Sequence, residues 1–164
     1  MPKIYSIVSP VTSQFSILRN VPSGGAATIA VGVPTKAVDA TAASPYLGTV
    51  AVMVDGDGTT SQRFSGIAKD TSTDTASAAG TVNIWLPLPG MIYAGFAKSS
   101  TAVDTLAELV TFIGKRVVFD LTSTDWTVDT AAADSATNCV TIVGGEWQTS
   151  TVWFTVSTIG SMLQ

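Results

Sequence analysis

The side chains that could do chemistry are few, and the carboxylates come first. The segment 55–58 reads Asp-Gly-Asp-Gly, which places two aspartates one residue apart. A calcium loop of the EF-hand type needs further oxygen ligands at fixed offsets and a late glutamate, whereas the residues at 59–64 hold no carboxylate. Asp-Gly is also typical of tight hairpin turns, because both residues tolerate a positive φ. We therefore expect a turn rather than a metal site, joining strands over 48–54 and 62–68 into a hairpin.

Nucleophiles with a neighbouring base are missing from the sequence. The chain has no histidine, which excludes Ser-His-Asp and Cys-His arrangements and zinc sites of the His/Cys type. The single cysteine, Cys139, has no histidine to lower its thiol pKa, so we expect a buried structural residue. The two glutamates are Glu108 and Glu146, and no phosphate or dinucleotide loop is present. We predict a protein that is not an enzyme and that uses no cofactor and no metal.

Aromatic side chains leave a binding function open. The four tryptophans are Trp85, Trp126, Trp147 and Trp153. Aromatic platforms hold sugars and form hot spots of protein interfaces alike, but most of these residues are expected in the core or at its ends. Strand alternation over 81–86 places Val82, Ile84 and Leu86 on one face and Trp85 on the other. If the first face is buried, Trp85 points outward and is a candidate contact residue.

The charge composition indicates which kinds of partner the protein could bind. Charged residues make up 12% of the 164 residues, against about 25% in a typical globular domain. So few charges suggest that much of the surface lies against copies of the chain or another protein. The net charge is −4 and the basic residues form no stripe, which argues against nucleic acid and anionic lipid. No signal-peptide core or membrane-length apolar run is found, so we expect synthesis in the cytoplasm and no membrane partner.

Short alternating segments separated by turn residues indicate an all-β fold, a single antiparallel β-barrel or sandwich. One short helix is expected at about 105–113, because Thr105 and Glu108 have the spacing of a capping box. Its apolar stripe is Leu106, Leu109, Val110 and Ile113, and the helix is expected to plug one end of the barrel.

The organising stretch is 64–98. It is expected to hold a strand at 64–68, a small-residue loop at 70–80, a strand at 81–86, a proline turn at 87–90 and a strand at 91–97 that returns antiparallel.

Two domain parts are expected: residues 1–22 as an extended N-terminal arm or edge strand, and residues 23–164 as one β-barrel domain. Pro10 and Pro22 exclude a helix through the first part. Either it is the first strand of the barrel, or it is an arm that pairs with a neighbouring subunit.

Several local patterns resemble the capsid decoration (cement) proteins and related small head proteins of tailed bacteriophages. The patterns are M-V-D-G-D-G and F-S-G-I-A, T-D-T-A-S-A-A-G-T-V, L-P-L-P-G, and A-E-L with I-G-K-R-V before W-T-V-D, all within residues 52–156. The resemblance implies a β-barrel or β-tulip-like protein that binds the outer capsid lattice. Such proteins are often homotrimers at local three-fold positions, and they clamp neighbouring major capsid subunits. The resemblance implies no catalytic residues.

The expected partners are therefore the major capsid protein and further copies of the chain, on the capsid surface of a virion. The candidate capsid or subunit contacts are Ile4, Tyr5, Ile7, Phe15, Ile17, Arg63, Asp70, Asp74 and Trp85. Deletion of residues 2–21 is expected to abolish capsid binding and to leave the barrel folded. Two other functions stay open: a glycan- or receptor-binding β-module that uses Trp85 or Trp147, and a component of a tail tube.

Overall fold

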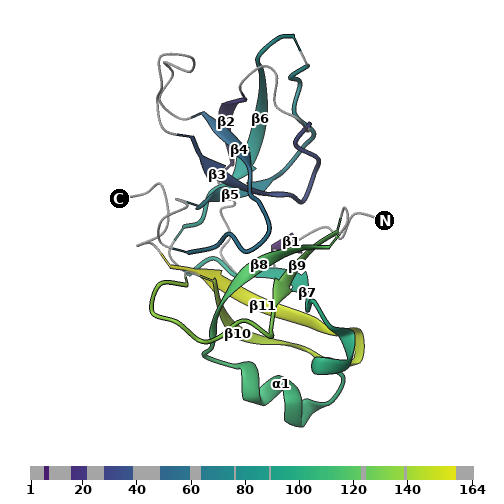
Figure 1. Ribbon diagram of the computed structural model, residues 1–164. Coiled ribbons are helices and arrows are strands. Elements are labelled where there is room, and N and C mark those ends of the chain that lie inside the picture. The colour runs from purple at the N-terminus through teal and green to yellow at the C-terminus, as the bar shows by residue number, and fades with distance from the viewer. Residues whose placement is uncertain are drawn as a thin grey trace.

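The protein is an all-β structure with one short α-helix, as the sequence predicts (Figure 1). The computed structural model describes residues 6–7, 16–21, 28–38, 49–59, 64–75, 77–88, 90–122, 125–138 and 140–157. The strands are β1 (Ser6–Ile7), β2 (Ser16–Val21), β3 (Pro34–Ala37), β4 (Val50–Val52), β5 (Phe64–Ala68), β6 (Gly80–Trp85), β7 (Tyr93–Phe96), β8 (Arg116–Thr122), β9 (Asp125–Asp129), β10 (Val140–Glu146) and β11 (Thr151–Val156). The helix is α1 (Leu106–Phe112), and the 3-10 turns are η1 (Ser100–Ala102) and η2 (Trp147–Thr149).

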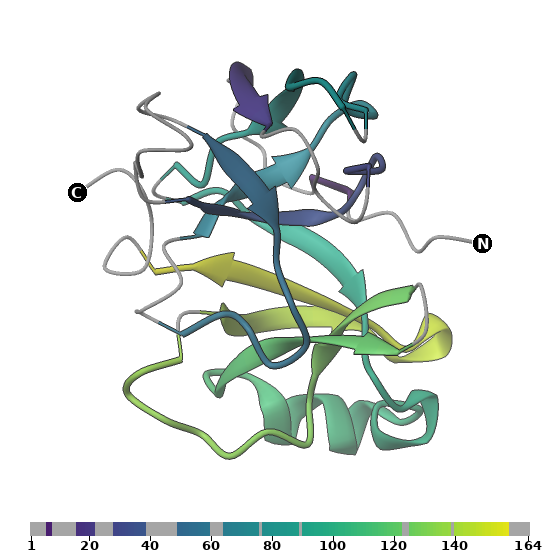
Figure 2. The same ribbon diagram turned by 45° about the horizontal axis from the view of Figure 1, so that its top comes forward.

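The strands form two antiparallel sheets that lie one above the other. One sheet has six strands in the order β1-β7-β11-β10-β8-β9, and the other has five in the order β2-β6-β5-β3-β4. Figure 2 shows the five-stranded sheet above, the six-stranded sheet below it, and α1 on the far side of the six-stranded sheet. The six-stranded sheet curls until Ala97 bridges Val128, and the Lys98 N–H donates to the Val128 carbonyl at 2.9 Å. That single bridge does not complete a ladder, so the architecture is sandwich-like rather than a closed barrel.

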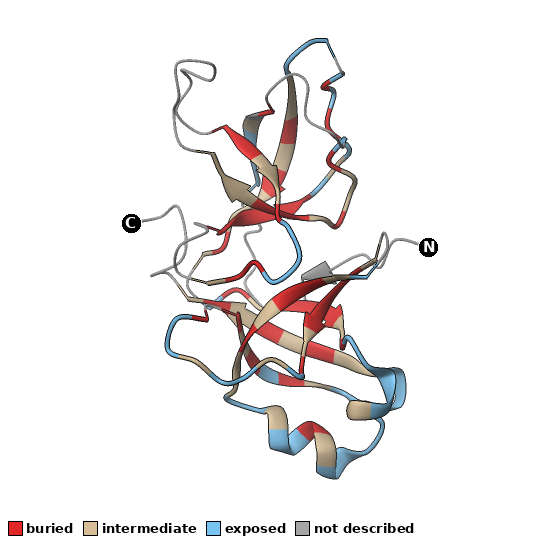
Figure 3. Cartoon of the chain, in the orientation of Figure 1, coloured by how far each residue is buried: buried red, intermediate tan, exposed pale blue. Residues whose placement is uncertain are grey.

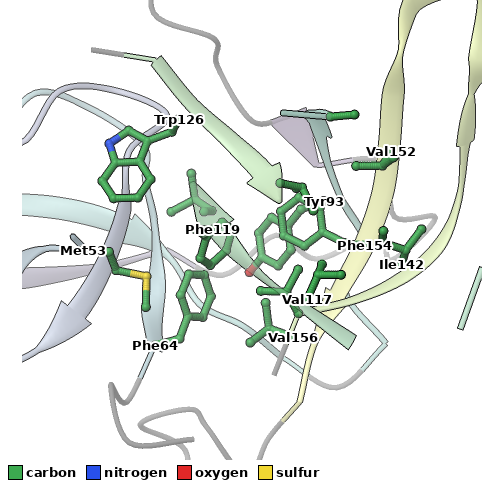
Figure 4. Close-up of a cluster of buried hydrophobic side chains, with 14 of the residues drawn as sticks. Met53, Phe64, Tyr93, Val117, Phe119, Trp126, Ile142, Val152, Phe154 and Val156 are labelled. Carbon is green, nitrogen blue, oxygen red and sulfur yellow. The ribbon is translucent and has the colours of Figure 1, made fainter. Parts of the chain in front are cut away.

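The larger hydrophobic core joins the two sheets. Its centre is a group of aromatic rings, drawn in Figure 4. Phe64 stacks on Phe119 and Tyr93 stacks on Phe154, each pair with 5.6 Å between the ring centres. Phe64 belongs to β5 of the five-stranded sheet, whereas the other three rings come from the six-stranded sheet. Burial of these rings therefore holds the sheets together, with about 25 cal/mol of stabilisation for each Å² of apolar surface removed from water.

A second, smaller hydrophobic core is formed mainly by side chains of the five-stranded sheet. It contains Val21, Ile29, Val50, Ala68, Val82 and Ile84. Val82 and Ile84 face it from β6 and are almost fully buried, which confirms their predicted alternation. Leu86 is half-buried and packs against the same cluster.

The proline segment 87–90 carries the chain from one sheet to the other. The predicted antiparallel return of β7 beside β6 is wrong, because β6 lies in the five-stranded sheet and β7 in the six-stranded sheet. The Tyr93 hydroxyl donates to the Leu86 carbonyl at 3.1 Å and ties the two ends of this crossing together. Prolines offer no N–H for a ladder, which suits a connection that leaves a sheet.

The segment 55–58 forms a turn but not a hairpin. Gly56 has a φ of 76°, and the Asp57 N–H donates to the Val54 carbonyl at 3.0 Å. The predicted pairing across this turn is wrong, because β3 lies between β4 and β5. The turn instead reaches the other sheet, where the Phe119 N–H donates to the Asp57 carbonyl at 2.7 Å.

The helix begins where the sequence predicts, but it buries less than predicted. Thr105 caps α1, and a full capping box with Glu108 is present. Leu109 is the buried residue of the helix, whereas Leu106, Val110 and Ile113 are 60%, 57% and 49% exposed (Figure 3). The helix does not plug the end of a barrel as expected: it lies on the outer side of the six-stranded sheet, and the core meets it along the side that carries Leu109 and the half-buried Phe112.

Candidate interaction surface

One face of strands β2 and β6 brings together Trp85 and Asp70, two of the residues predicted to make contacts. In the antiparallel ladder Ser16 pairs with Trp85, and Leu18 pairs with Asn83. Directly opposed residues point to the same side of a sheet, so these four share one face, opposite to the buried Val82 and Ile84. We call this surface the β2–β6 face and include Lys69 and Asp70, which follow β5 and border it.

Asp70 is held by Asn83. One carboxylate oxygen accepts the Asn83 backbone N–H at 2.9 Å, and the other accepts the side-chain Nδ2 at 2.6 Å. The Lys69 N–H also donates to the Asn83 carbonyl at 2.8 Å. Asp70 therefore lies on the predicted surface, but both of its oxygens already have a partner within the chain.

Trp85 is half-buried rather than fully outward. It packs against the larger core from one side, and the Lys69 ammonium lies 4.7 Å from the centre of its ring. Such a cation–π contact is worth about 0.5–1 kcal/mol at an exposed site. The same ammonium lies 3.5 Å from the Ser16 hydroxyl. Lys69 thus covers the indole that the sequence suggested as an open platform.

The apolar part of the face comes from β2. Leu18 is 58% exposed. The predicted contact Ile17 is 36% exposed but pairs with the buried Ile84, so it lies on the opposite face of β2 and not on this surface. β2 is a terminal strand in the described order of the five-stranded sheet. A terminal strand with exposed apolar side chains is a place where another chain can dock or add a strand.

Asp74 does not belong to this surface, and its prediction as a contact residue needs correction. The carboxylate is buried and accepts a hydrogen bond from the Ser72 hydroxyl. The Ser72 hydroxyl in turn accepts the Ile29 N–H at 2.8 Å. Asp74 therefore fixes the segment 71–75 from within, because alternate side chains of that segment turn inward.

The other predicted contacts are placed only in part. Ile4, Tyr5, Phe15 and Arg63 lie outside the described residues, as does Cys139. For Ile7 the structure describes the backbone, which pairs with Tyr93 as part of β1. Among residues 1–22, the described strands β1 and β2 thus pair within the chain, with β7 and β6 respectively.

The buried carboxylates elsewhere are bound to cations and hydroxyls. Asp57 accepts Lys36 at 2.8 Å and the Val54 N–H at 2.7 Å. Asp120 lies 2.6 Å from the Lys98 ammonium, which also lies 3.3 Å from Asp129.

The ion pair between Lys98 and Asp120 shifts the pKa of each group in the direction that favours its charged form. Its hydrogen bond to Asp120 raises the pKa of Lys98. Burial alone would raise the pKa of Asp120, but hydrogen bonds from Lys98, Thr122 and Thr127 and the ammonium charge outweigh it and hold that pKa below its usual value. A lysine kept protonated is no nucleophile, so the arrangement acts as an ion pair that ties β8 and β9 to the end of β7.

Within the described ranges, no group of three or more His, Cys, Asp or Glu side chains is placed to hold a metal ion. No helix in the same ranges is long and apolar enough to cross a membrane.

Comparison with known proteins adds no relative. No protein-family model matches the chain, and no curated protein matches it.

The sequence did not point to Leu18 or Lys69 as surface residues. The adjacent pair Ile17 and Leu18 is apolar at both positions, so alternation alone could not say which one faces water. Val21 supplies the missing signal, because its burial in the smaller core sets Ile17 on the inner side and Leu18 on the outer side.

Proposed function

We propose that the chain is a virion structural protein that binds the outer surface of a tailed-phage capsid and clamps neighbouring major capsid subunits. The observation that carries the proposal is the β2–β6 face, where the exposed Leu18 stands on a terminal strand beside Lys69 and the half-buried Trp85. A large apolar anchor with a polar rim is the usual make-up of a protein interface. The low charge content and the resemblance to capsid decoration proteins support the same function.

The physical basis of such a function is mass action. A protein that binds the assembled shell and not its free subunits stabilises the shell by RT ln(1 + L/Kd) per site, where L is its free concentration. Many copies on one lattice add modest contacts into a large total. A single face of moderate affinity is therefore sufficient for the proposed role.

Co-sedimentation with expanded capsids of the phage that carries the chain tests this proposal. The wild-type chain is expected to sediment with the capsids at a fixed copy number. Leu18→Ser should weaken binding about tenfold, the effect of about 1.4 kcal/mol at a modest hot spot. Val54→Ser is the matched control, because Val54 is 55% exposed but lies in the turn before Asp57, which hydrogen-bonds to Phe119 of the six-stranded sheet. Absence of the wild-type chain from the capsid pellet, or equal binding by the Leu18 and Val54 variants, would count against the proposal.

The N-terminal segment can be tested in the same assay, but with a shorter deletion than the sequence suggested. Removal of residues 2–21 would take away β2, which pairs with β6 and supplies Val21 to the smaller core. Deletion of residues 2–15 spares that strand. The deletion does remove β1, which pairs with β7 at two positions, so a somewhat lower melting temperature with a single folded transition is expected. If the segment reaches a capsid or sister subunit, this folded variant loses capsid occupancy; unchanged occupancy removes the segment from the proposal.

The alternative of glycan binding loses one of its two platforms. Lys69 covers the Trp85 ring, whereas Trp147 is 37% exposed in η2. A sugar-binding function would therefore depend on Trp147.

A further inference from the structure

The end of the molecule that carries α1 exposes a row of apolar side chains. Leu106, Val110 and Ile113 are 60%, 57% and 49% exposed. Their spacing of i, i+4 and i+7 places them along one stripe of the helix. Leu109, at i+3, lies at the edge of this stripe and enters the larger core, together with the half-buried Phe112 on the next turn. These three side chains therefore form an outer face of α1, and none of them belongs to the two hydrophobic core clusters of the described residues.

Strand β10 extends this apolar end. The Gly114 N–H donates to the Ile142 carbonyl at 2.8 Å, and a Cβ on Gly145 would lie 3.0 Å from Leu109 Cδ1. The helix thus runs antiparallel to the second half of β10. Val143 and Trp147, which are 40% and 37% exposed, belong to the same end of the molecule.

Exposed apolar residues are concentrated here. The eight large apolar side chains that are exposed in the described residues are Ile17, Leu18, Val54, Leu106, Val110, Ile113, Val143 and Trp147. Five of these eight residues lie at the α1 end of the molecule. They are Leu106 and Val110 of α1, Ile113 just after it, Val143 of β10 and Trp147 of η2. Contiguous apolar surface on a small protein marks an interaction site more often than it occurs by chance.

Charged residues at the two ends of α1 indicate what covers the stripe. Asp104 precedes its start and Lys115 follows its end, where the ammonium lies 4.6 Å from the centre of the Phe112 ring. Glu108 is used in the capping box and Arg116 pairs with Asp134, so the charges that matter for this contact are Asp104 and Lys115. A two-fold axis beside Val110, between positions 109 and 110, would set Leu106 against Ile113 of the partner subunit and Asp104 against Lys115 of the partner subunit. The helix dipoles would then run antiparallel, which is their favourable arrangement. A surface that is apolar in the middle, acidic at one end and basic at the other is complementary to itself in this way.

We propose that a second copy of this chain occupies the α1 stripe, through a two-fold antiparallel contact of α1 with α1 centred beside Val110. The contact differs from the three-fold arrangement that the resemblance to decoration proteins implies, and it does not depend on capsid binding. A helix of two turns covers less than the approximately 800 Å² per partner of a standard interface, so the dimer is weak and forms at micromolar concentrations. On a lattice, the high local concentration of neighbouring copies would strengthen it.

Sedimentation equilibrium of the purified full chain, without capsids, tests this pairing. The wild-type chain is expected to shift from 16.9 kDa toward twice that mass as its concentration rises to about 100 µM. Val110→Lys should weaken association at least tenfold, because it places two ammonium groups beside the axis. Thr111→Lys is the matched control on the same helix, since Thr111 is exposed but lies off the stripe, and it should associate as the wild type does.

Charge exchange tests the antiparallel geometry. Asp104→Lys should weaken association, and addition of Lys115→Asp in the same chain should restore it, because the two substitutions exchange the signs across the axis. Circular dichroism of each variant checks that the fold is retained. A wild-type chain that stays monomeric, a trimer, equal association of the Val110 and Thr111 variants, or no rescue by the double exchange would each overturn the proposed pairing. None of these results bears on capsid co-sedimentation, so the two proposals fail separately.

Discussion

At the scale of single residues, the carboxylates of this protein hold the structure together. Asp70, Asp74 and Asp57 each accept hydrogen bonds from nearby backbone or hydroxyl groups. The sequence predicted a turn for the segment that holds Asp57. It could not predict that Asp74 is buried, because nothing in a run of small residues shows which side chains turn inward. The pattern did place Val82 and Ile84 correctly, since alternation is regular within a strand.

Asp120 gives a pH-dependent prediction at this scale. Its side chain is 4% exposed, and it accepts Lys98 at 2.6 Å and the Thr122 hydroxyl at 2.7 Å. Asp120→Asn should lower the free energy of unfolding at pH 7 by about 2 kcal/mol, the typical loss for hydrogen bonds to a charged group. Urea unfolding measures it. Asp134→Asn is the control: its ion pair with Arg116 is exposed and 3.6 Å long, so a loss of no more than about 0.5 kcal/mol is expected.

The direction of the pH effect follows from the lowered pKa of Asp120. A carboxyl whose pKa is lower in the folded chain stabilises the fold above its ordinary value of 3.8 and loses that contribution as the pH falls through the folded value. The difference in unfolding free energy between the wild type and Asp120→Asn should therefore shrink as the pH falls through the folded-state pKa of Asp120. A difference that stays constant down to about pH 2 would show that the charge of Asp120 is not what stabilises the fold.

At the scale of elements, local sequence predicted several of the strands and the helix but not how they pair. The segments at 64–68 and 81–86 contain strands, and the helix begins at its predicted cap. Two expected hairpins do not form, at 55–58 and 87–90. A turn motif fixes only its own backbone, whereas the partner of the following strand depends on the core that it enters. Met53 and Phe64 enter the core shared by both sheets, which a local pattern does not encode.

The cap of α1 gives a prediction for this element. The Thr105 hydroxyl oxygen accepts the N–H of the residue at the third helical position at 3.2 Å. Thr105→Ala should reduce the free energy of unfolding by about 1 kcal/mol, because that donor loses its partner. Thr111→Ala, in the same helix, should be neutral or slightly stabilising, since alanine has the higher helix propensity. Equal effects of the two substitutions on urea unfolding would mean that the cap does not stabilise the helix.

At the scale of the whole molecule, the sequence predicted the all-β class and left a barrel and a two-sheet sandwich both open; the structure is sandwich-like. Strand signals recur along the chain without a change that marks two sheets. The aromatic core is shared by the two sheets, with Phe64 of one sheet packed on Phe119 of the other (Figure 4). We therefore expect the two sheets to unfold as a single cooperative unit.

Phe64→Ala tests this unity. Phe64 is fully buried, so the substitution should cost about 3–5 kcal/mol of unfolding free energy. Because the core belongs to both sheets, calorimetry should show one transition at a lower temperature rather than two. Leu18→Ala, on the surface, should leave the transition within about 0.5 kcal/mol of the wild type. Separate transitions in the wild-type chain would mean that the two sheets unfold independently.

The central claim is that this protein binds the outside of a capsid through the β2–β6 face. A cryo-electron microscopy reconstruction of the expanded capsid of the phage that carries the chain tests it most directly. We predict density for the two-sheet fold on the outer surface of the shell, with Leu18 and Lys69 facing major capsid subunits and α1 away from them. Density that places the β2–β6 face toward solvent, or that places the chain in the tail or nowhere on the shell, would contradict the claim.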